Sequence, residues 1–267
     1  MAISSVKDSP NPNQRLPERL FLGIDVGGTN VKVGLVGGRG DLHAKAITAT
    51  PSLKSPQRVV SHAIEFAHHQ LKKLGRGPSD LAGVGMAVPG VLDTEEYQLR
   101  EVVNLPGWLH EPLLEILSAS SGLPAAVVND ANSAAYAEHS VRGLQRQSLA
   151  LVTLGTGIGC GVVVKGRPYS GDHGCAGELG HIAVRFGSDA LPCTCGSRGH
   201  LESYAGASGV ITRLQRALTD LDPARIPGNL LADDLTPKEI ADAAEQGFEP
   251  CCRVIQETAQ LVGQAVG

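Results

Sequence analysis

Two cysteines and two histidines are spaced so that together they could hold one metal ion. Cys193 and Cys195 are one residue apart, His200 lies five positions after the second cysteine, and His181 lies upstream. Zn²⁺ in closed protein sites favours four sulfur or nitrogen ligands in a tetrahedron. Reduced thiols packed in a glycine-rich loop are the alternative, because cytosolic cysteine is usually inert. The full pattern C-x-C-G-x-x-G-H-x-E, with His181 as the fourth ligand, favours a zinc site.

An aspartate follows the strand that we predict at residues 125–128. Asn129 and Asp130 lie between this strand and a helix predicted at residues 131–141. Aspartate is a favoured N-cap, so Asp130 could simply begin the helix. Ligands of open α/β sheets, however, bind beyond the carboxyl ends of the strands. A capping role and a catalytic role therefore both stay open for Asp130 on this pattern.

Two glycine-rich turns join predicted strands and could bind phosphate. Each turn is followed by a strand, not by the helix that a dinucleotide-binding G-x-G motif requires, so each predicts a β-hairpin. A plain hairpin is the alternative to a site in which unshielded backbone amides approach a phosphate. Hard cations favour carboxylate and water ligands, so the aspartate before the first turn could face Mg²⁺. The candidate residues are Asp25, Gly27, Gly28, Thr29, Gly155, Thr156 and Gly157.

The composition limits the class of protein. Of the 267 residues, 42% are hydrophobic and 3% are aromatic, and the aliphatic and glycine content suits sheets packed by helices. The net charge of −4 gives no electrostatic footprint for nucleic acid. No apolar run is long enough to span a membrane, and the N-terminus lacks the apolar core of a signal peptide. We therefore expect a cytoplasmic protein that binds neither nucleic acid nor membrane.

Hydrophobic periodicity predicts an α/β chain with a polar lead-in. Residues 1–20 contain three prolines and predict a disordered segment. We expect a smaller α/β domain over residues 21–142 and a larger one over residues 143–267. Predicted strands cover residues 21–26, 31–36, 41–50, 81–88, 125–128, 149–154 and 162–164. Predicted helices cover residues 57–74, 111–121, 131–141, 207–218, 236–246 and 251–266.

Four motifs occur in the order found in the ROK sugar kinases (repressor, open reading frame, kinase), and this resemblance runs from about Phe21 to the end of the chain. They are D-x-G-G-T from Asp25, N-D-A-N-S-A-A-x-A-E from Asn129, the glycine turn at residues 155–161, and G-E-L-G-H with the cysteine pattern that follows it. His200 departs from the family pattern, in which a third cysteine is usual. Imidazole is also a good zinc ligand, so a Cys₂His₂ site is expected.

The resemblance implies a two-domain α/β fold of the actin/hexokinase (ribonuclease H-like) type, with mixed sheets and an interdomain cleft. It implies ATP-dependent phosphorylation of the primary hydroxyl of a hexose, with glucose converted to glucose 6-phosphate. Asp130 would be the general base, Mg²⁺ would lie beside the phosphates, and structural Zn²⁺ would hold a sugar-binding surface. The implied sugar contacts are Asn104, Asn129, Asp130, Glu178, His181 and Glu202.

Several alternatives stay open on the sequence. The motifs do not separate glucose from N-acetylmannosamine, fructose or allose. The family continues with a strand, a Gly-Gly contact to adenosine and a closing helix, so we expect the chain to be C-terminally incomplete after Gly267. A non-catalytic sugar-binding or regulatory protein of the same family is therefore a further interpretation. The resemblance also suggests a homodimer or homotetramer.

Overall fold

The computed structural model describes residues 19–53, 55–102 and 105–267. These residues fall into two compact units. The first comprises the chain up to Val88 together with Glu111–Val127, and the second comprises Pro89–His110 and Val128–Gly267. The predicted disordered lead-in lies outside the described residues up to residue 18, and the domain boundary at residue 142 stays a prediction.

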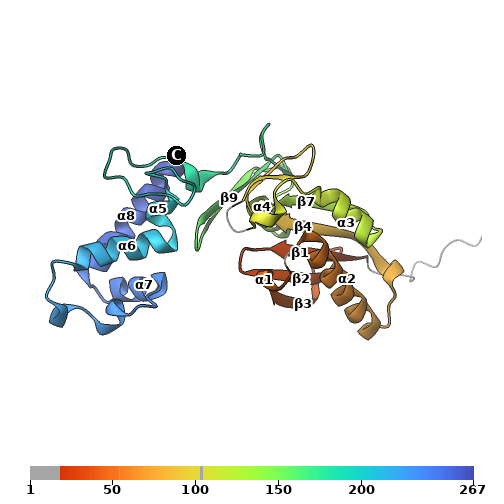
Figure 1. Cartoon of the computed structure of the whole chain (residues 1–267), viewed down its shortest axis with the longest axis horizontal. Helices are drawn as coiled ribbons and strands as arrows, with labels where there is room; N and C mark the ends of the chain where they lie inside the picture. Colours follow the sequence, from red (N-terminus) through yellow and green to blue (C-terminus); the bar gives the residue numbers. More distant parts are fainter. Residues whose placement is uncertain (1–18, 54, 103–104) are drawn as a thin grey trace, which may run out of the picture. The chain divides into compact units, whose positions relative to one another are not determined.

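The first unit is built on a five-stranded mixed sheet in the order β3-β2-β1-β4-β7 (Figure 1). The first strand, β1 (Leu20–Val26), pairs antiparallel with β2 (Asn30–Gly37) and parallel with β4 (Leu81–Val88). The outer strands are β3 (Leu42–Ala49) and β7 (Ala125–Asn129). Side chains of β1 are alternately buried and half-buried, as expected of a strand covered by helices.

Two helices of the first unit pack on this sheet and on each other, α2 (Pro56–Lys73) and α3 (Leu113–Ser121). The Ser55 hydroxyl caps α2 by accepting from the Arg58 amide, and Pro56 suits the first helical position. The apolar face of α2 is fully buried at Val60, Ala63 and Leu71, among others. Shorter helical turns of this unit are α1 (Thr50–Leu53) and η1 (Pro78–Asp80).

The second unit contains a three-stranded sheet in the order β10-β9-β8. Strands β8 (Leu149–Leu154) and β9 (Ile158–Val164) form an antiparallel hairpin, which β10 (Arg167–Pro168) extends. Helix α4 (Asp130–Val141) packs on this sheet. Two short strands, β5 (Val91–Leu92) and β6 (Leu99–Glu101), form a separate hairpin.

Helix α4 lies directly on the backbone of β9. A Cβ atom at Gly161 would clash with the backbone carbonyl of Ala131 and with the Ala135 side chain. Glycine is therefore required at this position of the strand, because any side chain would push the helix away. This close approach fixes the start of α4, where Asp130 lies, against the sheet.

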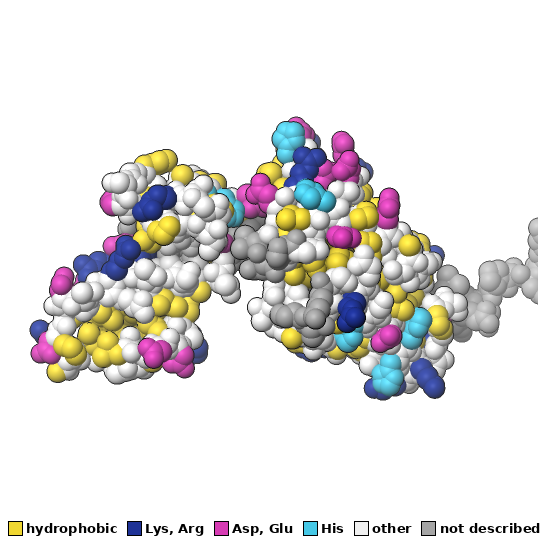
Figure 2. Space-filling view, in the orientation of Figure 1, with side chains coloured by type: hydrophobic (Ala, Val, Ile, Leu, Met, Phe, Trp, Pro, Cys, Tyr) yellow, Lys and Arg dark blue, Asp and Glu magenta, His cyan; other side chains and the backbone are white. Residues whose placement is uncertain are grey.

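The helices α5 to α8 complete the second unit. A buried cluster packs α6 (Ala207–Leu218), α7 (Pro237–Glu245) and α8 (Glu249–Val266) together, through residues such as Leu214, Ile240 and Val254. A second cluster joins β9, α5 (Glu202–Ala205) and α8. Hydrophobic side chains are also exposed over the α6–α7 region (Figure 2), including Leu221 and Leu231 in the connection between these helices. Single-turn helices of this unit are η2 (Pro106–Trp108), η3 (Leu179–His181), η4 (Pro223–Arg225) and η5 (Gly228–Leu231).

Each strand and helix predicted from periodicity is present, mostly within two residues at each end. The strand predicted at residues 162–164 begins four residues earlier, at Ile158, because the glycines of the turn belong to the strand. The hairpin of β5 and β6 was not predicted. Among helices of the described residues, none is both long and apolar enough to cross a membrane.

Candidate functional site

Asn129 and Asp130 are neighbours at the N-terminus of α4, and their side chains make different hydrogen bonds. The Asn129 side chain is the N-cap: its oxygen accepts from the Asn132 amide at 3.1 Å, and its nitrogen donates to the Gly90 carbonyl at 3.1 Å. The capping role that the sequence left open for Asp130 therefore belongs to Asn129. Asp130 lies in the first turn, where one carboxylate oxygen accepts from the Ala131 amide at 2.8 Å.

Glu178 is the centre of a group of carboxylates in the second unit. Burial raises the pKa of Glu178 above its ordinary value, and the negative charges of Asp130, Glu101 and Glu202 act in the same direction. His181 acts in the opposite direction and lowers the pKa of Glu178; its Nε2 atom lies 3.9 Å from a carboxylate oxygen of Glu178. Three predicted site residues, Asp130, His181 and Glu202, thus act electrostatically on a fourth, Glu178, and Glu101 acts on it as well.

The predicted metal ligands lie together in the geometry that a tetrahedral ion requires. Each of His181, Cys193, Cys195 and His200 offers one ligand atom, and these four atoms lie within 4.8 Å of one another. The two Nδ1 atoms are 3.4 Å apart, Cys195 Sγ is 3.3 Å from His200 Nδ1, and Cys193 Sγ is 3.9 Å from His181 Nδ1. Tetrahedral zinc with ordinary bond lengths separates two nitrogens by about 3.3 Å and nitrogen from sulfur by about 3.6 Å. The four residues therefore fit zinc.

Two local features suit this cluster to a metal. A backbone amide at Ser197 donates to the Cys195 thiol and lowers its pKa, which favours the thiolate that binds metals. His181 presents Nδ1 to the cluster and Nε2 to Glu178. The two nitrogens of one ring can thus serve a metal and a neighbouring group separately.

The two glycine turns are hairpin turns, as predicted, and part of their hydrogen bonding is internal. In the first, the Gly27 amide donates to the Asn30 carbonyl at 2.9 Å. Lys32 Nζ lies 2.9 Å from a carboxylate oxygen of Asp25, and both side chains are exposed. In the second, the Gly155 amide donates to the Gly157 carbonyl at 3.0 Å. Gly28 and Thr29 belong to the first turn and Thr156 to the second.

One contact was not expected from the sequence. A carboxylate oxygen of Glu202 accepts a hydrogen bond of 3.0 Å from the Ile158 amide, next to the second glycine turn. The sequence assigned Glu202 to sugar and the turn to phosphate. The structure places the two in direct contact within the second unit.

Asn132 was missed by sequence analysis. Its side chain is 2% exposed, and its oxygen accepts from the Val162 amide of β9 at 2.9 Å. Its nitrogen donates to the Ser170 hydroxyl at 3.4 Å. Asn132 therefore ties α4 to the sheet and to the loop that leads to Glu178. Its position in the N-D-A-N run was the available signal. The predicted sugar contact Asn104 lies outside the described residues.

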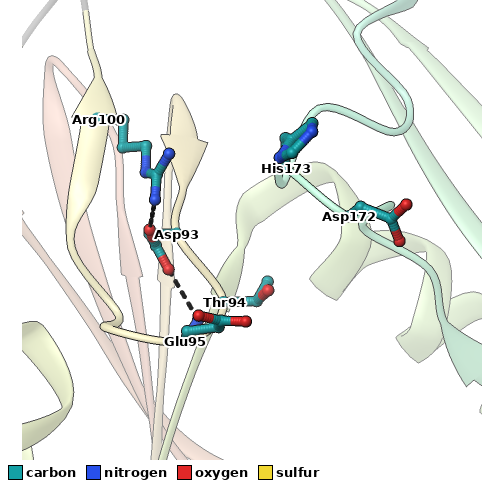
Figure 3. A pocket seen from close by; sticks show the side chains of 6 residues that line it. All are labelled: Asp93, Thr94, Glu95, Arg100, Asp172 and His173. Atoms are coloured by element: carbon teal, nitrogen blue, oxygen red, sulfur yellow. Dashed lines mark hydrogen bonds and ion pairs between the residues drawn. The ribbon is translucent and has the colours of Figure 1, made fainter.

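A cavity of ≈ 330 Å³ lies beside the β5–β6 hairpin and contains none of the predicted site residues (Figure 3). The hairpin contributes Asp93, Thr94, Glu95 and Arg100, and the loop after β10 contributes Asp172 and His173. Asp93 is buried, accepts from the amides of Glu95 and Glu96, and pairs with Arg100. Its charge is therefore already matched by protein groups.

Asp93 should stabilise the fold in a pH-dependent way. The two amide hydrogen bonds, with a smaller contribution from Arg100, hold the pKa of Asp93 below its ordinary value. A carboxyl whose folded-state pKa is lowered stabilises the fold above its unfolded pKa of about 3.9, and this contribution is lost as the pH falls through the folded pKa. Asp93→Asn should therefore lower the melting temperature at neutral pH, and the difference from the unsubstituted chain should shrink below about pH 4. A difference that is constant from pH 7 to pH 3 would contradict this role.

The chain is similar in sequence to a known protein family and to several of its members. The model of the ROK family matches residues 21–267. A glucokinase of Halalkalibacterium halodurans is 30% identical over 253 residues, which cover 94% of this chain and 76% of the relative. An N-acetylmannosamine kinase of Citrobacter koseri is 29% identical over 245 residues, covering 92% of this chain and 77% of the relative.

Solved structures agree with the sequence comparison. A ROK family glucokinase of Streptomyces griseus, in complex with glucose and AMPPNP, superposes with a TM-score of 0.69 at 28% identity. The match covers 92% of this chain and 78% of that structure. The mixed sheet of the first unit and the α/β elements of the second match the actin/hexokinase-like fold of such neighbours. The chain belongs to the ROK family.

Proposed function

We propose that this chain is a sugar kinase that transfers the γ-phosphoryl group of ATP to the primary hydroxyl of a hexose, with glucose as the substrate. The observation that carries the proposal is that Asp130, Glu202 and His181 all act electrostatically on the half-buried carboxyl group of Glu178 in the second unit. Carboxylates accept hydrogen bonds from sugar hydroxyls about twice as strongly as neutral acceptors do. The relatives named as glucokinases, one of them solved with glucose and an ATP analogue, support the same assignment.

Asp130 is proposed as the general base. The N-terminus of α4 fixes its backbone, and the Ala131 amide holds one of its carboxylate oxygens. The carboxylate would take the proton of the primary hydroxyl as the oxygen attacks the γ-phosphoryl group. Phosphoryl transfer depends mainly on positioning and on stabilisation of charge, so a single well-placed base suffices on the sugar side.

The sugar is proposed to bind to Glu178, Glu202 and His181, together with Asn104 and Asn129. Glu178 and Glu202 would accept from hydroxyls, and Nε2 of His181 would donate to one. Both polar ends of the Asn129 side chain already have backbone partners. A sugar hydroxyl could still contact the second amide hydrogen or the second lone pair of the amide oxygen.

Each glycine turn is proposed as a phosphate-binding loop. The residues are Gly155, Thr156 and Gly157 in the second unit, and Gly27, Gly28 and Thr29 in the first. Backbone amides without side chains can approach an anion closely. Asp25 would hold Mg²⁺ through water, and Mg²⁺ would neutralise charge that develops on the phosphoryl oxygens.

The Cys₂His₂ cluster is proposed as a structural zinc site. Its ligands come from η3 and from the loop before α5, which carry His181 and lead to Glu202. Binding of the metal would fix the orientation of the His181 ring and the position of Glu202. The cluster has no proposed part in the chemical step.

Release of ADP from MgATP in the presence of a panel of hexoses tests the proposal. Glucose should give the highest kcat/KM among glucose, N-acetylmannosamine, fructose and allose. If another hexose gave the highest kcat/KM, the assignment as a sugar kinase would hold and the proposed substrate would be wrong. Binding of a hexose without any release of ADP would instead indicate a non-catalytic sugar-binding protein.

A further inference from the structure

The second glycine turn contains a carboxylate of the protein itself. One oxygen of Glu202 accepts from the Ile158 amide at 3.0 Å. A Cβ atom at Gly157 would clash with this same oxygen. Glycine at position 157 therefore makes room for the carboxylate, and an anion already lies against the backbone of the turn.

The segment after Glu202 holds the other side of the turn. The Ala207 amide donates to the Gly155 carbonyl at 3.0 Å. A Cβ atom at Gly206 would approach the Thr156 carbonyl to 3.1 Å, so the backbones of the two segments are in contact there. Residues 202–207 are thus in direct backbone contact with the turn, while Gly155 and Thr156 are exposed.

Glu202 also faces the proposed sugar site. It is one of three carboxylates whose charge acts on Glu178. The same carboxylate oxygens can accept from the Ile158 amide in one state and from sugar hydroxyls in another. Glu202 therefore contacts the turn proposed to bind phosphate, and its charge acts on a residue proposed to bind the hexose.

We propose that Glu202 couples hexose binding to nucleotide binding. This inference rests on the proposed kinase function. Without hexose, the Glu202 carboxylate holds the Ile158 amide and repels a phosphate from the turn, because like charges in a partly buried site are poorly screened. With hexose bound, sugar hydroxyls donate to the carboxylate, which releases the amide and weakens the repulsion. Bound hexose therefore raises the affinity of the turn for a phosphate group, and bound nucleotide raises the affinity for hexose by the same factor.

Calorimetric titration with Mg²⁺ and AMPPNP, with and without the hexose of highest kcat/KM, tests this coupling. In the unsubstituted chain, saturating hexose should tighten AMPPNP binding by about 5- to 150-fold, the usual range of coupling between sites. Glu202→Gln keeps the size of the side chain and removes its charge. It should bind AMPPNP more tightly than the unsubstituted chain when hexose is absent, and its coupling should fall towards one.

Glu245→Gln is the matched control, because it removes the same charge at an exposed position at the end of α7 that has no proposed role. It should leave AMPPNP affinity unchanged both with and without hexose. A merely structural role of Glu202 would weaken AMPPNP binding in both conditions and would not change their ratio.

A second readout needs no substitution. Addition of hexose alone should shift the backbone amide resonance of Ile158, because its acceptor changes. Equal AMPPNP affinity with and without hexose, or an Ile158 resonance that does not move, would overturn the coupling and leave the kinase proposal intact. Failure of the unsubstituted chain to bind AMPPNP under either condition would contradict both.

Discussion

Asp130→Asn should lower kcat by about 10²- to 10⁴-fold, which is the usual contribution of a general base. Asparagine has nearly the same shape as aspartate, and its oxygen can still accept from the Ala131 amide that Asp130 contacts. It cannot take a proton at neutral pH. The hexose should therefore bind with an affinity within a few-fold of the original, since the loss is confined to the transition state.

Asp220→Asn is a suitable control for this experiment. Asp220 is exposed after α6 and has no proposed role, so the same substitution there should leave kcat unchanged. Steady-state kinetics with the preferred hexose and calorimetric titration with the hexose separate the two effects. If the Asp130→Asn variant kept full activity, Asp130 could not be the general base. A loss of hexose affinity as large as the loss of kcat would indicate a binding role instead.

Removal of the cluster metal should have the second-largest effect, and it should act on stability. Structural zinc contributes folding free energy because the unfolded chain has no preformed site. Chelation, or the Cys195→Ser substitution, should therefore remove bound zinc and lower the melting temperature. In a chain of this size, each kcal/mol of unfolding free energy that is lost lowers the melting temperature by about 2–4 °C, so we expect a decrease of many degrees. Metal content by mass spectrometry and the melting temperature are both read without measuring activity.

Three further variants make the metal prediction specific. Cys175→Ser changes an exposed cysteine outside the cluster and should alter neither zinc content nor melting temperature. His200→Cys restores the ligand usual in the family and should keep zinc, whereas His200→Ala should lose it. Equal zinc content in all three variants would exclude the cluster as the binding site.

The metal cluster was predictable from the sequence because three of its ligands are close in the chain. Cys193, Cys195 and His200 lie within eight residues, so local backbone geometry alone brings them near one another. His181 was found only because its own motif pointed to it. The strands and helices were likewise predictable from period-2 and period-3.6 patterns, since these depend on which face each residue buries.

The rest of the site depends on contacts between distant segments. Glu202 and Ile158 are 44 residues apart, and their hydrogen bond follows from the packing of α5 against β9 through a shared buried cluster. The β5–β6 hairpin has strands of two and three residues, too short to show a hydrophobic period. Whether Asn129 or Asp130 is the N-cap depends on the exact residue at which the helix begins, and sequence patterns do not define a helix end to within one residue.

Mass spectrometry of the sugar after incubation with MgATP tests the central claim most directly. The account predicts a hexose that carries one phosphoryl group, formed in equal amount with ADP, and greatly reduced in the Asp130→Asn variant. Release of ADP without a phosphorylated sugar, or no reaction with any hexose of the panel, would contradict the assignment of this chain as a sugar kinase.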